Sequence, residues 1–131
     1  MRRLTILVAV LAAATLAGGL ASTASARTLD QARYLCPNGQ ICLFEHNDYN
    51  GEWVAFRGYI RYLDQYNFED RASSYVNDSG IAYCLYETGN FNGVRYYVPS
   101  AGHAGWARPS LGSWGDRVSS LSEMTWGMRC T

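Results

Sequence analysis

The run CLFEHNDYNG at residues 42–51 is the strongest indication of the fold, because it returns 42 residues later as CLYETGNFNG at residues 84–93. A second run, DRASS at residues 70–74, returns as DRVSS at residues 116–120, this time 46 residues later. Self-similarity at an ordered spacing indicates one supersecondary unit that is present twice. The second copy therefore carries four extra residues ahead of its DRVSS run.

The residues around these runs have the composition of short antiparallel strands. Candidate strands are rich in β-branched and aromatic residues and are bounded by Gly, Asn, Asp or Pro. They cover residues 41–45, 53–56, 74–76, 81–86, 94–98 and 118–124. Helical periodicity is weak after residue 26. The sequence predicts an all-β domain with two halves, at about residues 40–79 and 80–126, joined by a polar linker at residues 77–80.

Each copy contains an aromatic residue, four residues, a second aromatic, any residue and a glycine. The glycine allows the positive φ that a tight hairpin bend requires. With the paired serines downstream, this spacing is similar to the folded-hairpin signature of βγ-crystallin Greek keys. The resemblance implies a βγ-crystallin-like sandwich of two Greek-key motifs, in which a serine hydroxyl holds each hairpin. The matching residues are Phe44, Tyr49, Gly51, Ser74, Tyr86, Phe91, Gly93 and Ser120. Ser73 and Ser119 are the alternative candidates for the serine whose hydroxyl holds each hairpin. Alternatively, the aromatic residues belong to the core of some other small β sandwich.

A narrower resemblance rests on two runs. The pattern Cys-Pro-x-Gly-x-x-Cys-Leu-x-Glu at residues 36–45, together with DRASS at residues 70–74, is similar to that of peptidase inhibitor family I36, an exported bacterial group with this fold. The resemblance implies a secreted inhibitor of an extracellular peptidase, of the metalloproteinase type. A rigid loop can fill a protease cleft at low entropic cost. The two candidate loops are residues 36–42 and residues 99–114. The structural alternative for the first is a simple N-terminal clasp, and for the second it is an irregular strand and loop of the second Greek key.

Two other functions fit the same fold. One is a calcium-binding or purely structural extracellular βγ-crystallin module, and the other is a killer-toxin-like antimicrobial protein. We do not expect an enzyme, because the two histidines, His46 and His103, belong to no common hydrolase, zinc-protease or phosphate-binding motif. Glu45 and Glu87 are equivalent through the duplication, which does not place them at the separation that glycoside hydrolysis needs.

Calcium is the one cofactor that the resemblance implies. The family's calcium motif matches residues 69–74 and 115–120, although Glu69 and Gly115 depart from its first position. Calcium takes about six to eight oxygen ligands, and extracellular modules bind it weakly, at roughly 10⁻⁴ to 10⁻³ M. The candidate ligands are Asp70, Ser73, Asp116, Ser119, Glu45 and Glu87. In the alternative interpretation the two aspartates pair with neighbouring arginines and the serines hold the hairpins.

The four cysteines are Cys36, Cys42, Cys84 and Cys130. An even number of cysteines in an exported chain favours two intrachain disulfides. Of the three possible pairings we favour Cys36 with Cys42, because the Pro-Asn-Gly turn between them can bring the sulfurs together, and this leaves Cys84 with Cys130. Zinc is the alternative, but the closely spaced cysteine pairs of a zinc site are missing.

The N-terminus has the pattern of a secretory signal peptide. Arg2 and Arg3 precede an uncharged, Ala- and Leu-rich stretch that ends before the triplet Ala-Ser-Ala at residues 24–26. A retained membrane anchor is the alternative, but Gly18 and Gly19 break the apolar run short of the ~20 residues that a span needs. We expect residues 1–26 to be removed and residues 27–131 to be secreted as one domain.

Charge limits the partners of that domain. The whole chain has 11 Arg and 11 acidic residues, so removal of Arg2 and Arg3 leaves a small acidic excess. Nucleic acid is an unsuitable partner, since phosphate binding needs a clustered basic face. After signal removal no segment is apolar enough to span a membrane, so we expect a secreted protein. We also expect a monomer, and its candidate partner is an extracellular peptidase.

Overall fold

The computed structural model describes residues 25–125 and 129–130. The predicted signal peptide therefore lies outside the described residues except for Ser25 and Ala26. The described helices and strands are α1 (Leu29–Leu35), β1 (Ile41–Phe44), η1 (Asn47–Tyr49), β2 (Trp53–Phe56), η2 (Leu63–Tyr66), β3 (Ser74–Asn77), β4 (Tyr83–Thr88), β5 (Asn92–Val98), β6 (Ala107–Arg108), η3 (Gly112–Trp114) and β7 (Ser120–Glu123), where η marks a 3₁₀ helix. None of these helices is long and apolar enough to cross a membrane.

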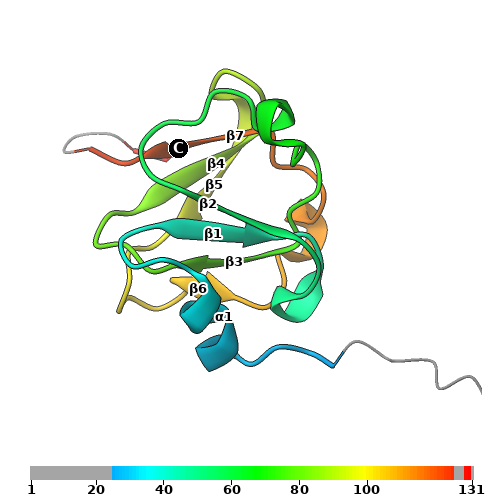
Figure 1. Ribbon diagram of the computed structural model, residues 1–131. Coiled ribbons are helices and arrows are strands. Elements are labelled where there is room, and N and C mark those ends of the chain that lie inside the picture. The colour runs from blue at the N-terminus through cyan, green and yellow to red at the C-terminus, as the bar shows by residue number, and fades with distance from the viewer. Residues whose placement is uncertain (1–24, 126–128, 131) are drawn as a thin grey trace, which may run out of the picture.

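The strands form two antiparallel sheets (Figure 1). Sheet A has the order β2-β1-β3-β6, and sheet B has the order β5-β4-β7. The predicted class, an all-β sandwich of two Greek keys, is confirmed. Strand β2 spans the residues predicted for it, whereas β4 begins two residues later than predicted, at Tyr83. The short strand β6 lies inside the stretch 99–114 and was not among the predicted strands.

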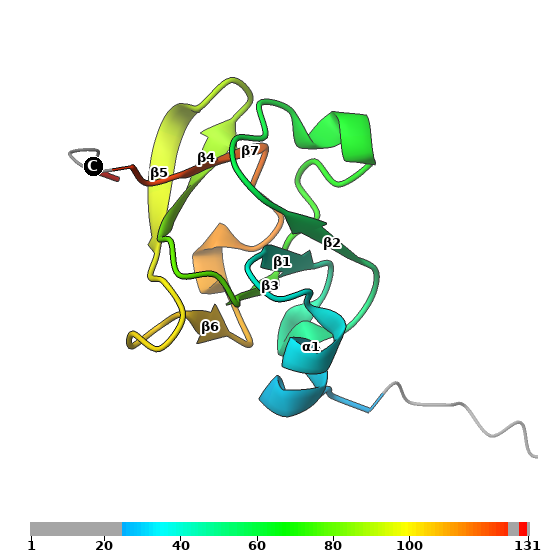
Figure 2. The same cartoon turned by 60° about the vertical axis from the view of Figure 1, so that its left-hand side comes forward.

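The two halves exchange their edge segments. Strand β6 comes from the second half but pairs with β3 of the first, where Val76 lies opposite Ala107. In return, Ile60 of the first half bridges Leu121 of β7 through two backbone hydrogen bonds of 2.9 and 3.0 Å. Figure 2 shows the long segment after β2 passing from sheet A to sheet B. Each sheet is therefore completed by the other half, which ties the halves into one unit.

The main core lies between the sheets. In β1, Ile41 and Leu43 face this core while Cys42 and Phe44 face away from it, since neighbouring side chains of a strand point to opposite faces. The fully buried members of the core are Ile41, Leu43, Leu63, Ala72, Tyr75, Tyr83, Leu85, Val98, Val118 and Leu121. Because both halves supply these side chains, one core stabilises the whole domain.

A second cluster lies on the outer face of sheet A, where α1 covers Phe44 and Val76 with the buried side chain of Ala32. The weak helical periodicity of the sequence did not reveal this helix. The Thr28 hydroxyl accepts from the Gln31 N–H at 3.2 Å, and the Gln31 side chain accepts from the Thr28 N–H at 2.9 Å. This capping box starts the helix. A helix of 7 residues is too short to show clear periodicity, but Thr-x-x-Gln is a start signal that can be read from sequence.

Both predicted disulfides are present. Cys36 joins Cys42 with 5.8 Å between their Cα atoms, and Cys84 joins Cys130 with 5.6 Å. Cys42 and Cys84 occupy equivalent positions in β1 and β4, and both face away from the main core. The first bridge fixes the segment that follows α1, and the second fixes the C-terminal segment to the outer face of sheet B.

Candidate functional site

The second serine of each pair holds a folded hairpin. Ser74 Oγ donates to the His46 carbonyl at 2.7 Å and accepts from the Tyr49 N–H at 3.1 Å. Ser120 makes the same two contacts in the second half, with Thr88 at 2.7 Å and Phe91 at 3.0 Å. In both hairpins the second signature aromatic has a positive φ and packs on the first aromatic, with ring centroids 5.7 Å apart in the first half and 5.6 Å in the second. Gly51 and Gly93 have φ values of 77° and 83°, which a larger residue would adopt only with strain.

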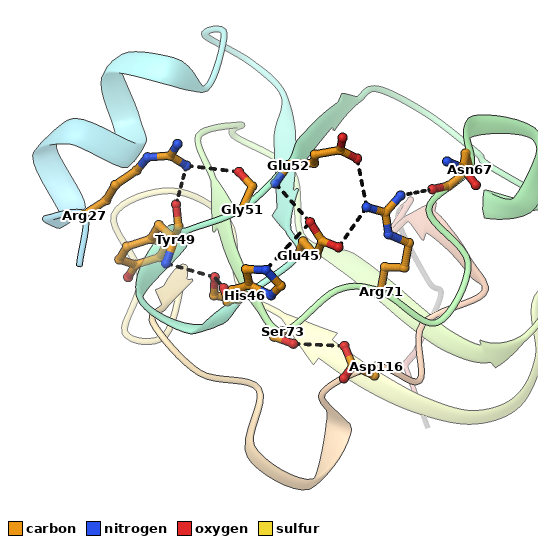
Figure 3. Close-up of polar contacts among 11 residues, drawn as sticks. Arg27, Glu45, His46, Tyr49, Gly51, Glu52, Asn67, Arg71, Ser73 and Asp116 are labelled. Atoms are coloured by element: carbon orange, nitrogen blue, oxygen red, sulfur yellow. Dashed lines mark hydrogen bonds and ion pairs between the residues drawn. The ribbon is translucent and has the colours of Figure 1, made fainter. Parts of the chain in front are cut away.

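The first serine of each pair reaches into the other half instead. Ser73 Oγ donates to Asp116 Oδ1 at 3.0 Å, as Figure 3 shows, and Ser119 Oγ donates to Asp70 Oδ1 at 3.2 Å. Both aspartates have a left-handed backbone, with φ of 53° and 57°. The candidate calcium ligands are thus brought together across the two halves, whereas the sequence motif groups them within one half.

The two glutamates among the candidate ligands lie in ion pairs. Arg71 Nη2 is 2.8 Å from a carboxylate oxygen of Glu45 and 2.8 Å from one of Glu52, while Arg117 Nη2 is 2.5 Å from Glu87 (Figure 3 shows the first cluster). The Arg71 guanidinium, followed by the backbone N–H of Glu52, lowers the pKa of Glu45. Arg71 and Arg117 therefore pair with glutamates, and Asp70 and Asp116 accept hydrogen bonds from serine hydroxyls. The alternative in which the two aspartates pair with neighbouring arginines is not what the structure shows.

This arrangement supplies only part of a calcium shell. Among the residues that the structure describes, no group of three or more His, Cys, Asp and Glu side chains could hold a metal ion. Each Asp and Ser pair offers two side-chain oxygens, and Glu45 and Glu87 are already neutralised by arginines. Main-chain carbonyls and water would have to complete the six to eight ligands that calcium takes, on the order of four or more per site.

The two candidate inhibitory segments meet on one dipeptide of the linker. The Gly39 N–H donates to the Asp78 carbonyl at 3.0 Å, and the Ala101 N–H donates to the Ser79 carbonyl at 2.8 Å. The disulfide ring at residues 36–42 and residues 99–106, the part of the second candidate segment (99–114) that precedes β6, therefore flank the linker from both sides. We call these two segments, together with residues 77–80, the linker edge.

Side chains hold both segments of the linker edge in place. Asn77, which is buried, donates from its amide to the carbonyls of Ile81 at 2.8 Å and Pro99 at 2.9 Å. The Tyr75 hydroxyl donates to the Gly105 carbonyl at 2.7 Å, and burial raises the pKa of Tyr75, so this donor stays protonated. On the other side, Arg57 Nη2 donates to the carbonyl of Asn38 at 2.8 Å.

The tip of the loop at residues 99–106 is exposed. The His103 N–H donates to the Ser100 carbonyl at 3.1 Å, and the Trp106 N–H donates to the His103 carbonyl at 3.0 Å, which folds the tip on itself. His103 Nδ1 lies 3.0 Å from Ser100 Oγ, so the ring is oriented with Nε2 as its remaining nitrogen. The sequence marked this stretch by its extra residues, but the contact with the linker accompanies the pairing of β6 with β3 of the other half.

Comparison with solved structures supports the fold. A βγ-crystallin from Ciona intestinalis is 26% identical and covers 66% of this chain and 100% of its own, with a TM-score of 0.57. A βγ-crystallin domain from Clostridium beijerinckii is 24% identical, with 64% and 95% of the two chains covered and a TM-score of 0.54. A βγ-crystallin from an archaeon is 19% identical, with 67% and 100% covered and a TM-score of 0.56. No curated protein gives a match.

A family model adds the assignment that the fold alone does not give. The model for peptidase inhibitor family I36 matches residues 30–98, which include all of α1 but Leu29, the disulfide ring, both folded hairpins and the linker. The match ends before the loop at residues 99–106, so it covers one side of the linker edge. Since it spans more than half of the chain, the protein belongs to peptidase inhibitor family I36.

Proposed function

We propose that the protein is a secreted inhibitor of an extracellular metalloproteinase-type peptidase, and that it binds through the linker edge without catalysis of its own. The observation that carries this proposal is the meeting of the disulfide ring and the exposed loop on Asp78 and Ser79. Both segments are held by hydrogen bonds and, for the ring, by a disulfide. Such preorganised loops lose little conformational entropy when they enter a cleft.

The loop tip supports the metalloproteinase type. Catalytic zinc sites keep one coordination position open for water or substrate, and a neutral imidazole is a common zinc ligand. His103 is exposed at the tip, and its Nδ1 is engaged by Ser100 Oγ. A partner on one ring nitrogen orients the ring and selects the tautomer that the other nitrogen presents. His103 Nε2 is therefore the group that we assign to the metal of the target.

The test is an inhibition assay with the purified domain. Metalloproteinases and serine proteases are each incubated with the domain at micromolar concentration, and the cleavage of a peptide substrate is followed. We expect the metalloproteinases to be slowed. A ring-opened variant, Cys36→Ser with Cys42→Ser, is expected to inhibit more weakly because its loop loses preorganisation. No slowing in either class, or slowing of serine proteases alone, contradicts the proposal.

Calcium binding is a second candidate, and it rests on the two crossed Asp and Ser pairs. Asp70 and Asp116 would hold the ion together with Ser119 and Ser73, and the ion would link the two halves. Binding would be weak, because calcium competes with hydroxyl donors for the aspartates and the nearby glutamates are paired with arginines. Calorimetric titration of the EDTA-treated domain is expected to show millimolar binding that Asp70→Asn with Asp116→Asn abolishes. No heat and no rise in melting temperature at millimolar calcium contradicts it.

A further inference from the structure

The outer faces of the two sheets are equivalent through the repeat but differ in chemistry. In sheet A, Trp53 lies opposite Phe44 and Val76 lies opposite Cys42. In sheet B, the matching registers place Arg95 opposite Tyr86 and Ser122 opposite Cys84. Two apolar positions of sheet A are therefore replaced by a cation and a hydroxyl in sheet B.

The difference in chemistry matches the covering of the two outer faces, since α1 packs on sheet A and a cavity lies on sheet B. Helix α1 lies against sheet A and away from sheet B in both views (Figures 1 and 2). Ala32 of this helix and Cys36, which follows it, bury the outer face of sheet A. On the outer face of sheet B, described residues line a cavity of about 620 Å³ that includes Tyr86 and Ser122. The hydroxyl groups of these two residues are 3.0 Å apart and hydrogen-bonded. The cavity on sheet B thus combines this buried hydroxyl pair with the apolar side chains of Phe91 and Met124.

The cavity is positive in a domain with a small acidic excess. Arg61, Arg95 and Arg129 line it, against one acid, Glu123. The Glu123 carboxylate already accepts from the Gly58 N–H at 2.8 Å and from the Tyr83 hydroxyl at 3.2 Å. A cavity lined by an excess of one sign of charge concentrates ligands of the opposite sign.

Aromatic rings position two of the arginines. The guanidinium carbon of Arg61 lies 5.4 Å from the centroid of Phe91, and that of Arg95 lies 5.6 Å from the centroid of Tyr86. Arg61 is further fixed by donation to the Asn90 side chain at 2.5 Å. Stacking orients the planar donor fork of arginine, which matches the geometry of a carboxylate. The cavity also has a half-exposed ring, since Tyr59 keeps 49% of its surface accessible.

We propose that this cavity binds a small saccharide that carries carboxylate groups, of the uronic acid class. The arginines would hold the carboxylates, the hydroxyls of Tyr86 and Ser122 would bond sugar hydroxyls, and the Tyr59 ring would pack on a sugar face. The volume lies within the roughly 300 to 1,000 Å³ of small-molecule sites. The cavity shares no lining residue with the linker edge.

The experiment is a calorimetric titration of the wild-type domain with trigalacturonate. The neutral trisaccharide of galactose and the acidic tripeptide triglutamate are titrated in parallel. We expect trigalacturonate to bind and the neutral sugar to bind at least tenfold more weakly. Added salt is expected to lower the affinity for trigalacturonate. The double variant Arg61→Gln with Arg95→Gln is expected to lose at least tenfold in affinity.

The matched control is Arg33→Gln. It removes one positive charge, where the double variant removes two, from an arginine that also lies over an aromatic ring, with 5.1 Å from its guanidinium carbon to the centroid of Trp106. Affinity is expected to stay at the wild-type value. Tyr59→Ala is a second test that leaves the arginines in place, and it is expected to weaken binding severalfold. Melting curves establish that each variant is folded. Equal binding of the neutral sugar, a preference for triglutamate, or full affinity in both the arginine and the Tyr59 variants overturns the proposal.

Discussion

Ser73 and Ser74 are neighbours in the chain, yet their hydroxyls serve different parts of the molecule. Ser74 is fully buried and bonds two backbone groups of its own hairpin, whereas Ser73 bonds Asp116 of the other half. The sequence could not separate the two roles, because the serines are adjacent and chemically identical. Only the pairing of β1 with β3 determines which hydroxyl faces the hairpin.

We predict that Ser74→Ala destabilises the domain by about 1–3 kcal/mol, because it leaves the Tyr49 N–H and the His46 carbonyl without their buried partner. Ser73→Ala removes an exposed hydrogen bond and is expected to cost less. Urea unfolding of both variants measures the difference. A Ser73→Ala variant as unstable as Ser74→Ala would show that the hairpin does not depend on the buried hydroxyl.

The ion pair of Glu45 with Arg71 makes the unfolding free energy depend on pH. The folded-state pKa of Glu45 is lowered, chiefly by its hydrogen bond from Arg71, so the pair stabilises the domain above the unfolded-state pKa of about 4.3 and this contribution is lost as the pH falls through the folded-state pKa. We predict that Glu45→Gln narrows the difference in unfolding free energy between neutral and acidic solution. Glu69→Gln, at an exposed position in the same half, is the charge-matched control. An unchanged difference in the Glu45 variant contradicts this prediction.

At the scale of elements, strands and helix differ in how far they could be predicted. Strands β1 and β4 follow from the repeat and from their β-branched and aromatic composition. All four residues of β1 are buried, because Cys42 and Leu43 point to opposite faces and both faces are covered. Strand β6 has two residues, and its pairing with β3 is decided by a partner that lies some 30 residues earlier. Helix α1 is too short for a periodic pattern and is stabilised by its capping box and by burial on sheet A.

The capping box of α1 gives a prediction for that element. Thr28→Ala removes the hydroxyl that accepts from the Gln31 N–H and is expected to cost about 0.5–2 kcal/mol, whereas Thr28→Ser keeps an equivalent oxygen and should stay close to wild type. The unfolding free energy in urea and the amide exchange of the helix report the effect. Equal loss in the serine variant would indicate that side-chain packing, rather than the cap, determines the change.

At the scale of the whole molecule, two equivalent cysteines fix different ends of the chain. Cys42 and Cys84 match in the repeat, but the first bridges 6 residues back to Cys36 and the second bridges 46 residues forward to Cys130. The pairing could be predicted because the Pro-Asn-Gly turn favours the short ring. The meeting of that ring with the loop at residues 99–106 could not, since it requires the exchange of strands between the halves.

We predict that removal of the longer bridge costs more stability. In the chain-entropy model a closed loop constrains the unfolded chain more as it lengthens, which gives about 4 kcal/mol for Cys84 with Cys130 and about 2 kcal/mol for Cys36 with Cys42. Denaturant unfolding of the two paired Cys→Ala variants tests this order. The reverse order would show that the short ring stabilises the folded state by contacts beyond its own closure.

We propose that the linker edge makes the contact with the target peptidase and that His103 is its metal-facing group. The most direct measurement is the inhibition constant of the wild-type domain, His103→Ala and His46→Ala against one zinc metalloproteinase. His46 is the matched control, because it is the other histidine, is exposed, and lies in the first hairpin away from the loop tip. We predict that His103→Ala raises the inhibition constant at least tenfold while His46→Ala leaves it unchanged. Equal inhibition by all three proteins, or loss with the His46 variant alone, would contradict the claim.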